Sequence, residues 1–383
     1  MHETMFPLKN PSPDFELFRE ILMGEIKPDR VHFVELSVDD YVINYVAEKL
    51  MKQKNTLASA PWDKKAKLFL EGGNASQLLE EEKLYYKKII NFYYLMGYDY
   101  VPVWEPSALL LVLISKSRIT YTAGRLRAWV EENEGLIKSW EDFENFPWDR
   151  IKLDIEDYLK FFCDNLPEGM KITFTSSLYE WVGERFLGYV GMFQKLYLEP
   201  DLVKAVFDKW GQIVYEQYKK AVSFDCVGAI FHGDDLGYKK GTMLSPNMLR
   251  EIVFPWFKKY SSLAHQHGKM YWYHCCGNVL SVIEDLIEDV KIDAFHSFQD
   301  VIMPVWKFKE KYGDRVAVLG GVDVDKLTRF DRETLRRYVR KILDKCMPGG
   351  RYGFGSGNSI TNYVPPENYL TMLEEGLKWR PIK

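Results

Sequence analysis

Eight short apolar or aromatic runs, separated by longer segments, constrain the fold of this chain more than any other feature. Each run is rich in β-branched or aromatic residues and ends in polar or turn-forming residues, as buried strands do. Several of the intervening segments, such as 200–223 and 331–346, carry apolar residues at helical spacing. The predicted strands are 31–35, 100–104, 171–177, 228–235, 269–277, 292–298, 315–323 and 351–358.

The alternation of strands and helices predicts an α/β protein, and its strand number predicts a distorted (β/α)8 TIM-type barrel. A doubly wound open sheet is the alternative. No G-x-G-x-x-G follows the first strand, so the dinucleotide-binding form of that fold loses support. We expect one domain over residues 1–383, with helical additions in an N-terminal extension (1–30) and an insertion (105–165) between the second and third strands. Within the insertion, 119–122 could pair in a small hairpin.

Composition excludes several classes of protein. A content of 46% hydrophobic and 28% charged residues is globular, and a net charge of -4 gives no electrostatic footprint for nucleic acid. No apolar run approaches the ~20 residues that span a bilayer, and the N-terminus has no signal-peptide pattern. Five cysteines, two of them adjacent, do not form a disulfide framework. We therefore expect a cytoplasmic monomer or homodimer with reduced cysteines and a small-molecule substrate, and neither nucleic-acid nor membrane partners.

Polar residues follow the predicted strands where the active site of a barrel enzyme lies, at the carboxyl ends. Loops are polar in any case, which accounts for serines and aspartates better than for histidines within aromatic runs. The residues predicted to be catalytic are Asp234, Asp235, His274 and His296. The residues predicted to bind substrate are Glu35, Glu105, His232, Tyr238, Asn278, Asp323, Ser356 and Asn358.

The run His274-Cys275-Cys276 has the most distinctive chemistry. Alternate residues of a strand face the same side, so His274 and Cys276 could ligate one metal ion while Cys275 points away. An imidazole and a thiolate suit Zn²⁺, and a catalytic zinc needs a third protein ligand and an open position. The spacing alone leaves open a buried cysteine pair beside a hydrogen-bonded histidine. The acids at 234 and 235 could likewise be acid–base groups, ligands, hydrogen-bond acceptors or part of a turn with a helix cap.

Several ordered stretches resemble the uroporphyrinogen decarboxylase superfamily. They are 28–31, 233–256, 273–278, 296–305, 313–327 and 355–370. The resemblance implies a single distorted barrel with a deep cleft. True uroporphyrinogen decarboxylases carry an R-Q-A-G-R segment and an F-S-D-I-L motif, and neither is present here, where 101–111 reads VPVWEPSALLL. Decarboxylation of uroporphyrinogen is therefore not the expected activity.

The chain is more similar to the cobamide-dependent methyltransferases of that superfamily. Their zinc-dependent members carry H-x-C on one strand and a later cysteine in G-C-G. His274 and Cys276 match the first pair, but Ser356 stands at the later position. Because serine is a poor zinc ligand, the resemblance leaves open a site without zinc, a hydrogen-bonding pocket, or another third ligand. The candidates for that ligand are Asp234, Asp235, His232 and His296.

The resemblance implies an enzyme that moves a methyl group between a small molecule (a methoxy-aromatic compound, an amine or a thiol) and a corrinoid. The chain has no D-x-H-x-x-G corrinoid-binding signature, so we expect the corrinoid on a partner protein and no covalently bound cofactor. A decarboxylase of uroporphyrinogen-like or other carboxylates is the first alternative. A non-catalytic barrel that binds a ligand is the second.

Overall fold

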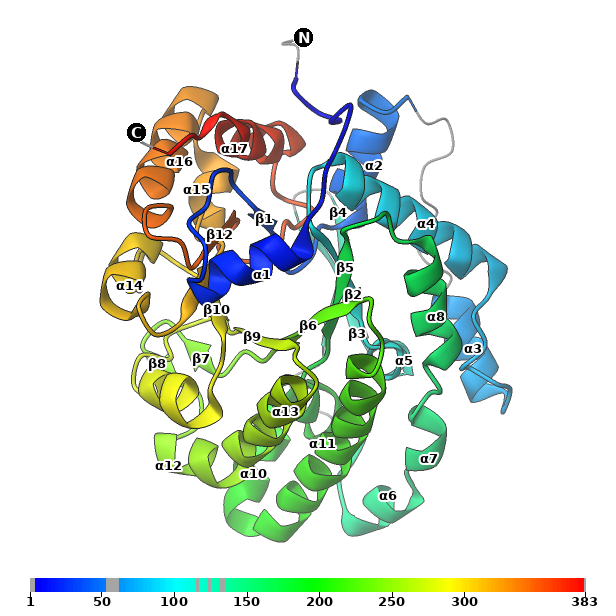
Figure 1. The fold of residues 1–383 in the computed structure, drawn as a ribbon. Helices are drawn as coiled ribbons and strands as arrows, with labels where there is room; N and C mark the ends of the chain where they lie inside the picture. Colours follow the sequence, from blue (N-terminus) through cyan, green and yellow to red (C-terminus); the bar gives the residue numbers. More distant parts are fainter. Residues whose placement is uncertain (1–3, 53–61, 115–116, 123–124, 131–134, 382–383) are drawn as a thin grey trace.

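The computed structural model describes residues 4–52, 62–114, 117–122, 125–130 and 135–381. At its centre, eight strands form one curled sheet with helices around it (Figure 1). The strand order is β1-β12-β11-β10-β9-β6-β5-β2, and each strand is parallel to its neighbours in this order. The strands are β1 (Phe33–Val34), β2 (Tyr100–Trp104), β5 (Lys171–Thr175), β6 (Val227–Gly233), β9 (Met270–His274), β10 (Ala294–His296), β11 (Ala317–Leu319) and β12 (Tyr352–Gly355). The prediction of a distorted (β/α)8 barrel is confirmed, and each predicted run overlaps one of these strands.

The helices follow the predicted alternation, with π-helical turns beside three of the loops. The π-helical turns are η1 (Val182–Leu187), η2 (Leu249–Val253) and η3 (Asp285–Val290). The α-helices are α1 (Phe15–Met23), α2 (Asp40–Lys49), α3 (Trp62–Leu70), α4 (Glu80–Leu95), α5 (Pro106–Ile114), α6 (Trp140–Asn145), α7 (Trp148–Ile151), α8 (Glu156–Asn165), α9 (Tyr179–Trp181), α10 (Tyr189–Leu198), α11 (Pro200–Val222), α12 (Pro246–Met248), α13 (Phe254–Gln266), α14 (Val305–Tyr312), α15 (Val324–Arg329), α16 (Arg332–Cys346) and α17 (Pro366–Lys378).

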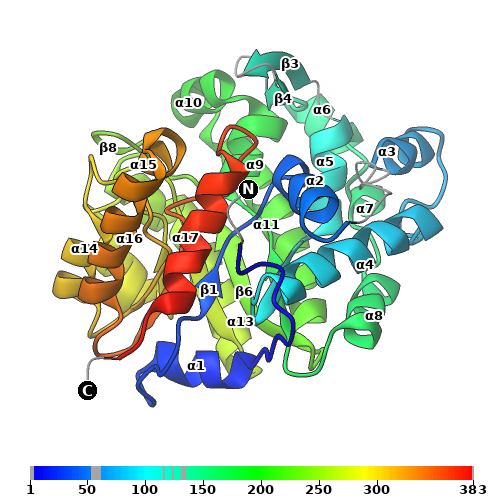
Figure 2. The same ribbon diagram turned by 90° about the horizontal axis from the view of Figure 1, so that it is seen from above.

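Two antiparallel hairpins lie outside the barrel sheet. β3 (Ser117–Thr122) pairs with β4 (Arg125–Val130) within the segment predicted as an insertion, so the hairpin expected at 119–122 is confirmed. β7 (Gly237–Tyr238) pairs with β8 (Gly241–Thr242) directly after β6. Figure 2 shows α1 at one end of the molecule and the β3–β4 hairpin at the other.

Helix α1 closes the amino-terminal end of the barrel. Its buried residues Phe15, Phe18 and Leu22 belong to the same apolar cluster as the inward-facing side chains of the strands. The ring of Phe15 stacks on Trp272 of β9, with 5.9 Å between ring centroids. Gly228 permits this approach, since a Cβ at that position would lie 2.3 Å from the Phe15 ring. Because the barrel interior is filled with apolar side chains and α1 covers its amino-terminal end, a functional site is expected at the carboxyl end.

The two end strands of the order, β1 and β2, are joined through side chains. Within the described residues no backbone ladder connects them. The hydroxyl of Tyr100 instead donates to the carbonyl oxygen of Glu35 (2.7 Å) and accepts from its N–H (3.0 Å). At the amino-terminal side, the buried Asp99 contacts Nδ1 of His32 (2.7 Å) and the guanidinium of Arg30 (3.2 Å). Hydrogen bonds of Tyr100 and Asp99 therefore close the barrel.

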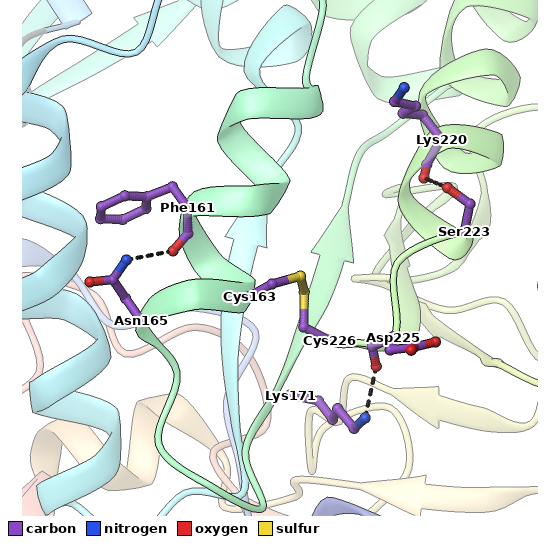
Figure 3. The surroundings of a disulfide bond; sticks show 8 residues. All are labelled: Phe161, Cys163, Asn165, Lys171, Lys220, Ser223, Asp225 and Cys226. Atoms are coloured by element: carbon purple, nitrogen blue, oxygen red, sulfur yellow. Dashed lines mark hydrogen bonds between the residues drawn. A yellow bond between two sulfur atoms is a disulfide. The ribbon is translucent and has the colours of Figure 1, made fainter.

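A disulfide joins Cys163, near the end of α8, to Cys226, directly before β6 (Figure 3). The expectation that the cysteines are all reduced is therefore wrong for this pair. Their sequence separation of 63 hid the contact, which arises because β5 and β6 are neighbours in the sheet. Cys275, Cys276 and Cys346 are free. In the described part of the chain, no helix combines the length and apolar character needed to cross a membrane.

We predict that Tyr100→Phe lowers the free energy of unfolding by about 1–3 kcal/mol, because it leaves the buried backbone groups of Glu35 without their partner. Tyr271→Phe is the matched control. Tyr271 is equally buried, and its hydroxyl has no hydrogen-bond partner among the described residues. Its loss should change stability by less than about 0.5 kcal/mol. Equal losses in urea unfolding of the two variants would contradict the account of the barrel closure.

Candidate functional site

The inward-facing row of β9 changes from apolar to polar at its carboxyl end. Trp272 lies in the barrel interior, and His274 and Cys276 follow it at alternate positions. Cys275 takes a different direction, since its sulfur accepts a hydrogen bond from the N–H of Leu236 at 3.3 Å. The alternation of β9 therefore continues through the two residues after its end and separates the adjacent cysteines, as the sequence pattern predicts.

The neighbouring strands bring further groups to the same place. Parallel register pairs His274 with His296 of β10 on one side and with Gly233 of β6 on the other. A Cβ at Gly233 would lie 3.8 Å from the ring of His274 and 3.9 Å from the hydroxyl of Ser177, so Gly233 lies against both groups. The hydroxyl of Ser177 is buried and has no partner among the described residues.

Three ligand atoms converge at this point. Nε2 of His274 lies 3.5 Å from Sγ of Cys276 and 3.6 Å from Oδ1 of Asp235. The ligand atoms of the three residues all lie within 4.8 Å of one another, a spacing that could hold a metal ion. The same Asp235 oxygen accepts the backbone N–H of Cys276 at 2.7 Å, which fixes the loop after β6 against the end of β9.

Burial sets the charge states of this group. It lowers the pKa of His274 to about 3, so the imidazole is neutral at pH 7. Burial and the Asp235 carboxylate raise the pKa of the Cys276 thiol. Burial also raises the pKa of Asp235, although its hydrogen bonds with Cys276 oppose the change. Asp235 keeps a third of its side chain exposed, which leaves one side of the group open.

Asn358 contributes a hydrogen bond to the sulfur of Cys276. Its amide orientation follows from Ser359, whose N–H donates to Oδ1 of Asn358 at 2.7 Å. Nδ2 of Asn358 therefore faces Sγ of Cys276, at 3.0 Å. A donor at this position favours the thiolate over the thiol.

His296 and Ser356 lie behind His274. Nδ1 of His296 lies 2.7 Å from Nδ1 of His274, and its Nε2 lies 3.1 Å from the carbonyl oxygen of Ser356. Burial, together with the neighbouring His274, lowers the pKa of His296, and the hydrogen bond to Ser356 opposes this. His296 is fully buried.

The hydroxyl of Ser356 is directed at Glu35 and at the carbonyl oxygen of Asn358. Oε1 of Glu35 also accepts the N–H of Ser356 at 2.9 Å. Burial raises the pKa of Glu35 to about 8, against the lowering effect of the Ser356 hydrogen bonds, so Glu35 is mostly protonated at pH 7. The hydroxyl of Ser356 is thus engaged by Glu35 and the backbone of Asn358.

Asp234 and His232 form hydrogen bonds with other parts of the protein next to the site. The fully buried carboxylate of Asp234 accepts the backbone N–H groups of Leu178 (2.9 Å), Tyr179 (3.0 Å) and Glu180 (2.8 Å), which begin α9. Nε2 of His232 lies 3.0 Å from the same carboxylate. Both residues are therefore occupied within the protein, and their contacts are those of structural residues.

Within the described part of the chain, the remaining predicted binding residues form no hydrogen bond or ion pair with the side chains of Asp235, His274 or Cys276. Glu105 accepts the N–H groups of Ser107 (2.6 Å) and Ala108 (2.7 Å) as a cap of α5, and burial raises its pKa to about 7. Asn278 accepts the N–H of Leu280 (3.1 Å). Tyr238 is half exposed on the β7–β8 hairpin, and Asp323 caps α15.

Sequence reasoning missed Glu180 and Ser297. Burial, with the charges of Asp235, Glu184 and Asp234, raises the pKa of Glu180 well above its usual value. The hydroxyl of Ser297 lies 3.9 Å from Sγ of Cys276. Glu180 follows the predicted strand at 171–177. The turn after β5 folds so that the N–H of Glu180 donates to Asp234, and this contact brings Glu180 close to Asp235.

A groove of about 590 Å³ lies beside the group. The loops after β10, β11 and β12 line it, with Gln299, Asp323, Asn358 and Tyr363 among its residues. Asn358 lines the groove and also donates to the sulfur of Cys276, so this residue links the groove to the His274 group.

We predict different effects for the two adjacent acids. Asp234→Asn should lower the free energy of unfolding by about 2–5 kcal/mol, since an amide nitrogen would face buried N–H donors. Asp235→Asn should cost less than about 1 kcal/mol, because its amide oxygen can still accept the N–H of Cys276. Urea unfolding measures both, and a larger loss for Asp235→Asn would refute this division of roles.

Comparison with solved structures gives the same architecture. A methyltransferase from Methanosarcina mazei aligns with a TM-score of 0.63 at 14% identity, over 95% of this chain and 98% of that chain. A vitamin-B12 independent methionine synthase candidate from Listeria monocytogenes aligns with a TM-score of 0.45 at 12% identity, over 97% and 98% of the two chains. At these identities the first likeness supports the fold alone, and the second carries no argument.

Among curated proteins, none matches the sequence significantly. Residues 172–378, more than half of the chain, match the family model described as uroporphyrinogen decarboxylase (URO-D). The matched region begins in β5 and contains the residues of the His274 group and those of β12 behind them. The chain therefore belongs to the uroporphyrinogen decarboxylase family.

Proposed function

We propose that this protein is a methyltransferase that moves a methyl group between a small molecule and a corrinoid carried by a partner protein. The observation that carries the proposal is the convergence of His274 Nε2, Cys276 Sγ and Asp235 Oδ1 at the carboxyl end of the barrel. Family membership supports an enzyme, and a methyltransferase shares the fold of this chain.

The three residues fit Zn²⁺. They offer one nitrogen, one sulfur and one oxygen atom, the ligand types of zinc sites, and the open side at Asp235 leaves room for a further ligand. The set supports Asp235 as the third ligand, and the hydroxyl of Ser356 is engaged by Glu35. Bound at this position, Zn²⁺ would favour the deprotonated form of a substrate thiol or hydroxyl.

The protein's own groups hold and orient the reactants. In the proposal, the small molecule binds in the groove lined by Asn358, and Asn358 and His274 hold the sulfur of Cys276 in place. In the thiol direction, the substrate loses its proton to solvent and its sulfur forms the new S–C bond. The Co–C bond of the methylated corrinoid breaks at the same time and leaves its electron pair on cobalt.

The polarity of the site favours methyl transfer over decarboxylation of a polycarboxylate. The polar side chains in contact with Cys276 are Asp235, Asn358, Ser297 and the neutral His274, and Glu180 lies nearby. The groove also carries Lys326 and Arg329, but these cations are paired with Asp300 and Asp325. A substrate with several carboxylates would therefore have to compete with these acids for its cationic partners.

We predict that the protein purified without chelator contains about one Zn²⁺ per chain, as expected of a site with these ligands. His274→Ala, Cys276→Ala and Asp235→Ala should each lower the bound zinc measured by elemental analysis. Cys275→Ala is the matched control, because that neighbouring sulfur faces Leu236 and should not affect the content. Equal zinc loss in the Cys275 variant would contradict the assigned ligand set.

Activity is tested with methylcobalamin as a stand-in for the methylated corrinoid protein and a panel of alkyl thiols, under anoxic conditions. We expect a methyl thioether and cob(I)alamin, and about a hundredfold or greater loss with Cys276→Ala but not with Cys275→Ala. Cob(I)alamin with methoxy-aromatic compounds or methylated amines tests the reverse direction. Release of CO₂ from uroporphyrinogen would overturn the proposal in favour of a decarboxylase. An empty site with no turnover would overturn it in favour of a ligand-binding barrel.

A further inference from the structure

The contact between His274 and His296 determines where the protons of both rings lie. Their Nδ1 atoms are 2.7 Å apart, so a hydrogen bond joins them and only one of the two can be the donor. Both rings are buried, which disfavours a charged imidazolium. Each neutral ring therefore carries one N–H.

The carbonyl oxygen of Ser356 decides which ring donates. A carbonyl oxygen only accepts hydrogen bonds, so Nε2 of His296, at 3.1 Å, must carry the proton of that ring. Nδ1 of His296 is then an acceptor, and Nδ1 of His274 must be the donor. It follows that Nε2 of His274 carries no proton and presents its lone pair toward Cys276 and Asp235, the nearest polar groups on that side.

The surroundings hold this arrangement in place. The carboxyl group of Glu35 accepts the backbone N–H of Ser356 and so fixes that backbone. The ring of Phe231 packs edge-on against His296, with 5.8 Å between ring centroids. Gly320 has a φ of +77°, and a Cβ there would lie 2.0 Å from the Ser356 oxygen and 2.8 Å from Nε2 of His296. The close approach of these two atoms thus requires glycine at position 320.

We propose that His296 is a positioning residue, which holds His274 in the Nδ1–H form so that the Nε2 lone pair faces Cys276 and Asp235. Both ring nitrogens of His296 are engaged and the side chain is fully buried, so it does not touch substrate. This replaces the catalytic role predicted from its place in the sequence. The consequence for metal binding rests on the proposed function, whereas the tautomer is a property of the metal-free protein.

The tautomer can be read from long-range ¹H–¹⁵N correlations of the metal-free protein labelled with ¹⁵N-histidine. We expect His274 to show a protonated Nδ1 and an unprotonated Nε2, and His296 the reverse. His296→Leu should abolish the preference of His274 for the Nδ1–H form. His296→Gln should retain it, because a glutamine oxygen can accept from His274 while its amide donates to Ser356. His232→Gln, at an equally buried histidine outside this pair, is the matched control.

Zn²⁺ affinity, measured by competition with a chromophoric chelator, gives the second readout. We expect His296→Leu to weaken binding by about 10–100-fold and His296→Gln to restore most of it. A protonated Nε2 on His274 in the unsubstituted protein would overturn the inference, as would unchanged spectra and affinity in His296→Leu. The expected tautomer in a protein that binds no Zn²⁺ would support the inference and overturn the zinc site of the proposed function.

Discussion

The parallel register of β9 with its two neighbours is the constraint on which the site depends. It places His296 beside His274 on one side and Gly233 on the other. Within β9, the alternation that directs Trp272 into the apolar interior also directs His274 to the same side. A shift of one residue in this register would place Tyr273, instead of His274, beside His296 and would turn the side chains of β9 to the opposite face of the sheet. The packing of the barrel interior and the geometry of the site are therefore consequences of one pairing pattern.

The strands were predictable because parallel barrel strands are short, apolar and bounded by turn residues. The inward direction of His274 and Cys276 followed from the period of two along a strand. The contact of Cys276 with His274, and that of Cys275 with Leu236, agree with it. Strand ends were less predictable. The run predicted at 269–277 includes Cys275 and Cys276, which lie in the loop after β9 ends at His274.

The sequence alone could not separate the polar residues at the strand ends that support the fold from those that gather around His274. Asp234 and Asp235 are adjacent, yet one carboxylate is buried on the N–H groups of α9 and the other is partly exposed beside His274. That difference arises from the turn after β5, which is distant in sequence. The contact of Cys163 with Cys226 was hidden for the same reason, since only the pairing of β5 with β6 brings the two together.

The position of Ser356 explains how a site of this kind can differ from the H-x-C and G-C-G pattern of the zinc-dependent methyltransferases. In the proposed site, the Asp235 carboxylate replaces a thiolate as third ligand, so two anionic ligands still balance the charge of Zn²⁺. A carboxylate oxygen is a harder ligand than sulfur and donates less charge to the metal. The released position at 356 is used inside the protein, where the serine joins Glu35 to the backbone that orients His296. In this proposal the third ligand comes from the loop after β6 rather than from position 356, directly after β12, and Ser356 has a supporting role.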